Sequence, residues 1–122
     1  MEAGSGEVGT GDVFSLRLSV REAVSGGGRV AMYVVAQTPG GKWLSFVPRQ
    51  GRMTIVGGIH PAVVGGVIPA IEREILNMAI PGALTRGEYG FTAAVFNVGD
   101  AVTLSNWRQK AICASEAAVT VR

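Results

Sequence analysis

Hydrophobic and polar residues alternate most regularly in the segment VFSLRLSV, residues 13–20. A repeat of two places apolar side chains on one face of an extended chain and polar side chains on the other. The segment is therefore predicted to be a β-strand with one buried face. Its apolar positions include Phe14, Leu16, Leu18 and Val20, and its polar positions are Ser15, Arg17 and Ser19.

Further strands are predicted where β-branched and aromatic residues gather between turn-forming residues. The Pro-Gly turn TPGGK, residues 38–42, separates the first two of them, and Gly57 and Gly58 end the third. The predicted strands are RVAMYVVA (29–36), KWLSFV (42–47), MTIV (53–56), GEYGFTAAVFNVG (87–99) and AAVTVR (117–122).

Two segments have no single regular pattern. Residues 57–70 hold four glycines and two prolines among apolar residues, which predicts a loop. Residues 71–80 match both regular structures, so a short helix around residues 68–76 and a strand from about Ile75 remain alternatives. The helical spacing is that of Ile71, Ile75 and Met78, and the strand spacing is that of Leu76, Met78 and Ile80.

The spacing of these elements indicates the fold class. About seven short strands separated by Gly/Pro turns, at intervals of roughly 8 to 15 residues, are typical of an all-β sandwich or barrel. We expect an immunoglobulin-like antiparallel β-sandwich formed by one domain, residues 12–122. Residues 1–11, which are rich in Gly and Ser, are predicted to be a flexible N-terminal tail.

The stretch RGEYGF, residues 86–91, suggests how the two sheets are joined. In immunoglobulin-like sandwiches a tyrosine near the start of a late strand turns its hydroxyl back onto the backbone and holds the corner between sheets. Gly87 would supply the tight turn, Tyr89 the hydroxyl, and Phe91 a buried ring. We expect a structural role for these three residues.

Four motifs follow one another along the chain: Gly11 and Asp12, Tyr33 to Gly41, Pro81 to Phe91, and Asn106 with Trp107. In this order they resemble an immunoglobulin-like module that recurs in secreted and surface proteins of bacteria. The resemblance covers nearly everything from residue 9 onward. It implies an extracytoplasmic, non-enzymatic structural or binding module. Two features depart from the module: no aromatic residue precedes Gly11, and Met32 stands where an acidic residue is common.

Composition narrows the classes of partner. Apolar residues make up 48% of the chain and charged residues 16%, which indicates a substantial core and a surface poor in charge. The eleven Lys and Arg are scattered, so no nucleic acid is expected. No apolar stretch is long enough for a membrane span, and the N-terminus shows no signal peptide.

Candidate chemistry is sparse. His60 has no second ligand nearby, GGK at residues 40–42 lacks the rest of a phosphate loop, and Cys113 is the single cysteine. Glu72 and Glu74 would share one face of a strand, and we expect them to be exposed to solvent there and not to form a catalytic pair. No catalytic, cofactor or metal site is predicted, and the chain is not expected to be an enzyme.

Trp43, Trp107 and Arg108 are the candidate contacts with a ligand or partner, because Trp107 lies among polar residues. The expected function is a structural or protein-binding module outside a bacterial cell. A subunit of a surface assembly such as a pilus or filament would fit, with self-association or a protein partner. The alternative is a carbohydrate-binding module that uses exposed aromatic rings and binds a glycan.

Overall fold

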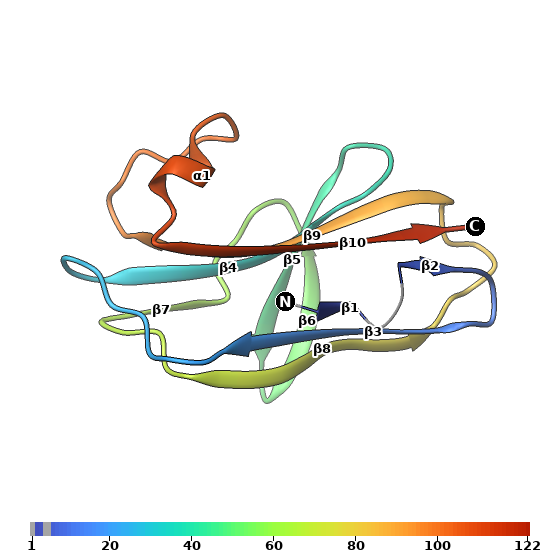
Figure 1. The fold of residues 1–122 in the computed structure, drawn as a ribbon, viewed down its shortest axis with the longest axis horizontal. Helices are drawn as coiled ribbons and strands as arrows, with labels where there is room; N and C mark the ends of the chain where they lie inside the picture. The colour runs from blue at the N-terminus through green and yellow to red at the C-terminus, as the bar shows by residue number, and fades with distance from the viewer. Residues whose placement is uncertain (1, 4–5) are drawn as a thin grey trace.

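The computed structural model describes residues 2–3 and 6–122 and shows two packed β-sheets (Figure 1). The small sheet has the order β1 (Glu2–Ala3), β3 (Val13–Val20), β8 (Ile71–Ala79). The large sheet has the order β2 (Glu7–Val8), β10 (Cys113–Val121), β9 (Gly87–Asn97), β4 (Val30–Gln37), β5 (Trp43–Arg49), β6 (Arg52–Gly57). The short strand β7 (Val63–Gly65) also pairs with β4, and a single turn of helix, α1 (Trp107–Lys110), precedes β10.

The predicted all-β sandwich is confirmed. Within the described residues, seven strands are six residues or longer, and every strand pair is antiparallel except β2 with β10. The order of the large sheet resembles that of variable-type immunoglobulin sandwiches, in which two extra strands extend the sheet beyond its central three. Here those extra strands are β5 and β6.

The core lies between the inner faces of the two sheets. Phe14 of β3 stacks on Phe91 of β9 with ring centroids 5.7 Å apart, and Phe46 of β5 packs against Phe91 at 6.4 Å. Leu16 and Ile68 are completely buried among them. One apolar cluster therefore runs through the whole sandwich, as expected for a single hydrophobic core.

Residues 71–79 form strand β8, so the helix considered around residues 68–76 is not formed. A shift in the pairing with β3 leaves Ile75 between two paired residues, because Leu16 pairs with Leu76 and Arg17 with Glu74. This bulge lets the adjacent side chains of Ile75 and Leu76 both contact the core. The extra residue breaks the repeat of two and explains the helix-like spacing in the sequence.

The segment predicted to be a flexible tail takes part in both sheets where the structure describes it. β1 pairs with β3, and β2 runs parallel to β10, with Val121 opposite Val8. The side chain of Val8 is 1% exposed, because it enters the core between the sheets. One apolar residue among glycines carries too weak a pattern to predict this burial. Residues 1, 4 and 5 lie outside the described part of the chain.

The corner before β9 has the geometry of a tyrosine corner. The hydroxyl of Tyr89 donates a hydrogen bond of 2.7 Å to the carbonyl oxygen of Thr85. Gly87 has φ = +129°, and a Cβ at this position would lie 2.9 Å from the Cβ of Pro39. Phe91 is buried in the core. Burial raises the pKa of Tyr89, and a side-chain hydrogen bond with Thr85 partly offsets this rise.

Candidate functional site

The outer face of the large sheet is apolar, although it does not face the other sheet. Ala31, Val35, Ala94 and Phe96 lie on this face of β4 and β9, and all four are buried. When one face of an antiparallel sheet is exposed to solvent, that face normally carries polar residues. A sheet that is apolar on both faces therefore needs a second cover.

Part of that cover is the segment of residues 98–112, which connects β9 to β10 and folds back over the sheet (Figure 1). The side chain of Asn106 shapes this segment: Oδ1 accepts a hydrogen bond from the backbone N–H of Thr103 at 2.7 Å, and Nδ2 donates to the carbonyl oxygen of Ala101 at 3.0 Å. The two ends of the segment are joined to the sheet region: the N–H of Val98 donates to the carbonyl oxygen of Arg29 at 2.8 Å, and the N–H of Ile112 donates to that of Val95 at 2.7 Å.

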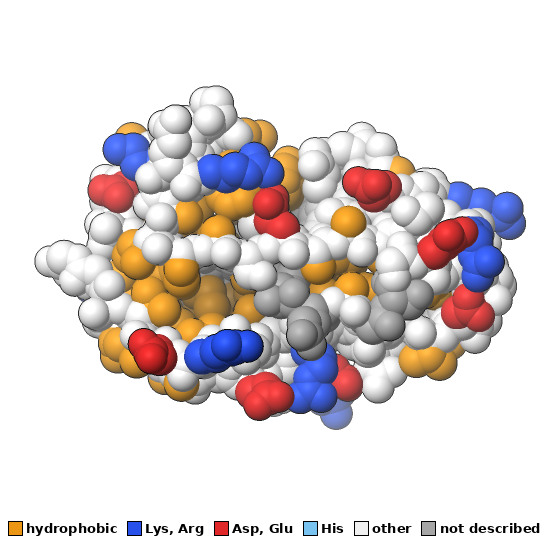
Figure 2. All heavy atoms as spheres, in the orientation of Figure 1, with side chains coloured by type: hydrophobic (Ala, Val, Ile, Leu, Met, Phe, Trp, Pro, Cys, Tyr) orange, Lys and Arg blue, Asp and Glu red, His pale blue; other side chains and the backbone are white. Residues whose placement is uncertain are grey.

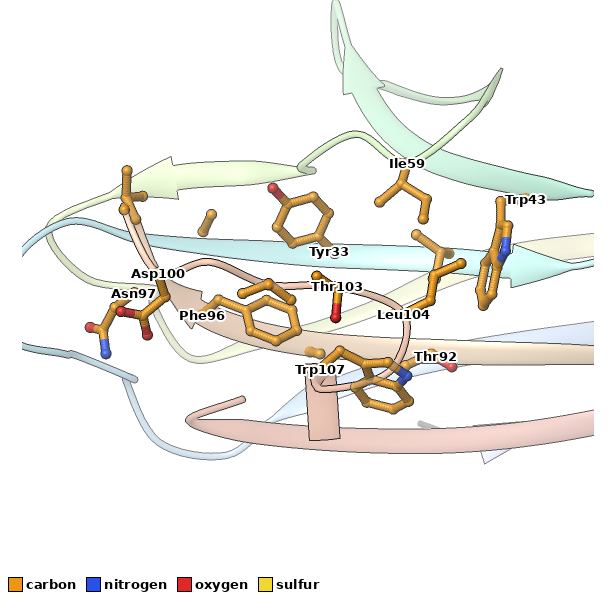
Figure 3. Close-up of a pocket in the computed structure, with 16 residues that line it drawn as sticks. Tyr33, Trp43, Ile59, Thr92, Phe96, Asn97, Asp100, Thr103, Leu104 and Trp107 are labelled. Carbon is orange, nitrogen blue, oxygen red and sulfur yellow. The ribbon is translucent and has the colours of Figure 1, made fainter. Parts of the chain in front are cut away.

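The cover is incomplete and leaves a hollow of about 520 Å³ between the segment and the sheet (Figure 3). Its volume is in the usual range for ligand pockets. Tyr33, Ile59 and Phe96 line it together with residues of the covering segment. A second hollow of about 550 Å³ shares four of these lining residues, namely Trp43, Thr92, Leu104 and Trp107. The two hollows therefore form one groove, here called the outer groove.

Trp43 and Trp107, which are far apart in the sequence, both line the outer groove. Trp43 begins β5 and pairs with Gln37, which places its side chain on the outer face, and Trp107 is the first residue of α1. Leu104 lies between the two indole rings (Figure 3) and is 61% exposed. The structure thus brings together the two tryptophans that the sequence singled out.

Arg108 holds Trp107 in place. Its guanidinium carbon lies 4.4 Å from the centroid of the Trp107 ring, and its Nη2 lies 2.8 Å from Oε1 of Glu116 on β10. A cation over the face of an indole ring is attracted to it, whereas an exposed ion pair contributes little to the free energy of folding. Arg108, predicted as a candidate contact, is therefore engaged with its own chain.

The charged residues of the outer groove are mainly acidic. Asp100 lines the first hollow, while Glu88, Glu116 and Arg108 line the second. The ion pair of Arg108 with Glu116 leaves the carboxylates of Asp100 and Glu88 as the excess charge. Cationic groups of a partner would be favoured at these two positions.

Several residues of the site were not predicted as contacts. Ile59, Phe96 and Leu104 carry no chemical motif, and only the uninterrupted apolar run AAVF, residues 93–96, indicates that β9 is covered on both faces. Phe46, the other aromatic residue of β5, lies in the core and does not line the groove.

The other sequence candidates serve local structure. The backbone N–H of His60 donates to Oγ of Ser45 at 2.8 Å, and its ring contacts the carbonyl oxygen of Gly57. Residues 40–42 belong to the turn between β4 and β5, where Gly41 has φ = +85°. Within the described residues no three His, Cys, Asp or Glu side chains gather as metal ligands would, and no helix is long and apolar enough to cross a membrane.

Charges are mixed over the surface seen in Figure 2. Basic and acidic side chains alternate there. Among the described residues, three arginines form ion pairs: Arg17 with Glu72, Arg108 with Glu116, and Arg122 with Glu7 and Asp12. The same view shows apolar side chains gathered between β10 and β3. This apolar group lies next to the region where β1 and β2 cover the molecule.

Comparison with known proteins identifies no relative, because no family model, no curated protein and no solved structure matches this chain.

Proposed function

We propose that this chain is a non-enzymatic protein-binding module and that the outer groove is its binding surface. The observation that carries the proposal is the apolar outer face of β4 and β9, which the covering segment closes only in part. Leu104 is exposed between two half-buried tryptophans, an arrangement in which an aliphatic or aromatic side chain of a partner would displace water.

The lining of the groove favours a polypeptide over a sugar. Sugars are held by flat exposed rings together with free polar groups, whereas this groove is lined largely by aliphatic side chains such as Val35, Ile59 and Val102. The groove has two amide side chains, Asn97 and Gln37, and that of Asn97 already accepts a hydrogen bond from the backbone N–H of Gly27 at 3.2 Å. The two indole rings line the sides of a hollow and do not form one open platform (Figure 3).

Carbohydrate binding is the second candidate, and the presence of Trp43, Trp107 and Tyr33 in one groove favours it. The module would then bind a glycan by stacking one sugar ring against an indole. The two candidates differ in their requirement for Leu104, which an apolar peptide would contact and a sugar would not need.

The proposed setting is the outside of a bacterial cell, in a structural or surface assembly such as a pilus or filament. Its support is the resemblance of the motifs from Gly11 to Trp107 to modules of secreted and surface proteins, and the low share of charged residues. A surface poor in charge suits lasting contact with a neighbouring subunit.

A selection of random peptides on the immobilised chain tests the proposed function, with a glycan array probed in parallel. We expect enriched peptides that carry apolar residues and a basic residue, and we expect Leu104→Lys to weaken their binding at least tenfold. Val13→Lys is the matched control, since Val13 is also exposed but lies on the small sheet. Glycan binding without peptide enrichment, or equal binding by both variants, would overturn the proposal.

A further inference from the structure

The strands at the ends of the two sheets differ in how well their free edges are protected. An unpaired edge exposes backbone N–H and C=O groups to any other extended chain, and proteins blunt such edges with charges, bulges or short strands. β8 carries a bulge at Ile75 and the charged run Glu72 to Glu74. β10 is covered at its C-terminal end by β2, and Glu116 lies near the middle of the strand.

β6 has no bulge and no charged residue near its middle. Within the described residues it pairs with β5 alone. Its sequence RMTIVG contains three successive β-branched residues, no proline, and one charged residue, Arg52, at the start. The side chain of Ile55, in the middle of this half of the hairpin, is 53% exposed. Figure 1 shows the β5–β6 hairpin crossing the direction of the neighbouring strands.

The turn of the hairpin determines which backbone groups of β6 face outward. Gln50 and Gly51 form a two-residue turn with φ of 51° and 77°, and Arg49 pairs with Arg52 across it. Both positive angles indicate a type I′ turn, whose flanking residues exchange backbone hydrogen bonds. The hydrogen bond of 2.9 Å from the N–H of Gly58 to the carbonyl oxygen of Trp43 follows the same alternation.

In this alternation Arg52, Thr54 and Val56 direct their backbone groups toward β5. The N–H and C=O groups of Met53, Ile55 and Gly57 therefore point away from the sheet, toward the free edge. An incoming antiparallel strand must match these three positions.

We propose that the β6 edges of two copies of this chain pair antiparallel around a two-fold axis, with Ile55 opposite Ile55 of the second copy. In this register Met53 of each copy lies opposite Gly57 of the other, so all three outward positions meet outward positions. Each such pair can exchange two hydrogen bonds, about six in total. The carbonyl oxygen of Gly57 would be shared with the ring of His60, whose Nε2 lies 3.0 Å from it, so the central Ile55 pair carries the contact. The two large sheets then form one continuous sheet.

The sequence of β6 suits a second copy as the occupant. In a two-fold symmetric contact the same surface patch lies on both sides. A charged residue near the two-fold axis therefore lies close to the same residue of the second copy, and only a charge far from the axis avoids this repulsion. Arg52 lies three residues from the axis at Ile55, which separates the two guanidinium-bearing residues by roughly 20 Å along the strands. This exceeds the screening length at physiological salt, and the apolar Ile55 side chains meet at the centre.

This contact uses an edge of the sheet and not the outer groove. It is independent of the proposed function, and either can fail alone. Because the contact is one strand pair, we expect weak, concentration-dependent association, at the low end of interface sizes.

Cysteine crosslinking tests the register directly. In a Cys113→Ser background, Ile55→Cys should form a disulfide-linked dimer on mild oxidation, because directly opposed residues of a hydrogen-bonded antiparallel pair have Cα atoms about 5.5 Å apart. Met53→Cys is the matched control on the same face, since the cysteine at this position in the second copy would be about 13 Å away along the strands. We expect at least tenfold faster dimer formation for Ile55→Cys. Equal rates for the two variants would overturn the proposed pairing.

A proline variant separates pairing from folding. Ile55→Pro removes an N–H that faces the free edge, so the hairpin keeps its own hydrogen bonds while the central intermolecular pair is lost. Ile55→Thr keeps the N–H and serves as its control. By sedimentation we expect association of the wild type and of Ile55→Thr at high concentration, and monomer for Ile55→Pro with an unchanged circular dichroism spectrum. A strictly monomeric wild type, or a folded Ile55→Pro that associates as strongly, would contradict the proposal.

Discussion

The hydroxyl of Tyr89 lies 2.7 Å from the carbonyl oxygen of Thr85, to which it donates a hydrogen bond. Tyr89→Phe removes this hydrogen bond and leaves the ring in place. We expect the free energy of unfolding to fall by about 1 kcal/mol, the usual net contribution of such a bond. Urea denaturation measures the change. Tyr33→Phe, on the outer face, is the control, and a loss no larger than that of the control would contradict the structural role of the corner.

The same tyrosine should make stability depend on alkaline pH. Burial raises its pKa above the ordinary value of 10.0 in the folded protein, despite a smaller opposing effect of the Thr85 side chain. The unfolded chain therefore loses this proton first as the pH rises. Its contribution is fully present below about pH 9 and is lost as the pH passes the ordinary value and then the folded pKa.

Urea midpoints measured at intervals from pH 8 to pH 11.5 check this dependence. The decrease with pH should be smaller in Tyr89→Phe than in the wild type. Parallel curves for the two proteins would show that Tyr89 does not contribute.

Gly87 should not tolerate a side chain. Gly87→Ala adds a Cβ within 2.9 Å of Pro39 at a φ of +129°, and strain of this kind costs on the order of 1–3 kcal/mol. Gly90→Ala is the control, because an added Cβ there meets nothing within 4 Å. Thermal unfolding should show a clearly lower midpoint for Gly87→Ala only, and equal midpoints would refute the role given to Gly87.

Val8 should stabilise the sandwich although it lies in a glycine-rich segment. Val8→Ala removes two buried carbon atoms from the core, which we expect to lower the free energy of unfolding by about 2 kcal/mol. Val13→Ala is the control, since Val13 is largely exposed. Urea denaturation of both variants provides the comparison. Equal stabilities would mean that residues 7–8 are not held in the sheet in solution.

Arg108 should control the exposure of Trp107. Arg108→Ala removes the guanidinium that lies over the indole ring and the ion pair with Glu116, so Trp107 becomes more mobile and more accessible. Acrylamide quenching of tryptophan fluorescence should increase in Arg108→Ala. Lys110→Ala changes a basic residue of the same helical turn and should leave quenching unchanged. Similar quenching in all three proteins would contradict the contact.

The local parts of this fold could be predicted from sequence because they depend on neighbouring residues. The repeat of two in residues 13–20 forms β3, and the Pro-Gly turn before Trp43 separates β4 from β5. The spacing of Gly87, Tyr89 and Phe91 indicated a corner whose hydrogen bond spans only four residues. These features need no knowledge of distant segments.

Other features were decided by pairing between distant segments. β8 is a strand because β3 pairs with it, and the bulge at Ile75 interrupts the repeat of two that would have identified a strand in the sequence. Val8 is buried because β10 offers an edge beside the core.

The amino-acid sequence by itself thus determined an all-β chain, its turns and its corner, since local sterics and alternation are sufficient for these. Only the tertiary structure decided that Trp43 and Trp107 share a groove and that β6 is left with an unprotected edge. Both depend on which strands become neighbours, and that choice is made by long-range hydrogen bonding and burial over the whole chain.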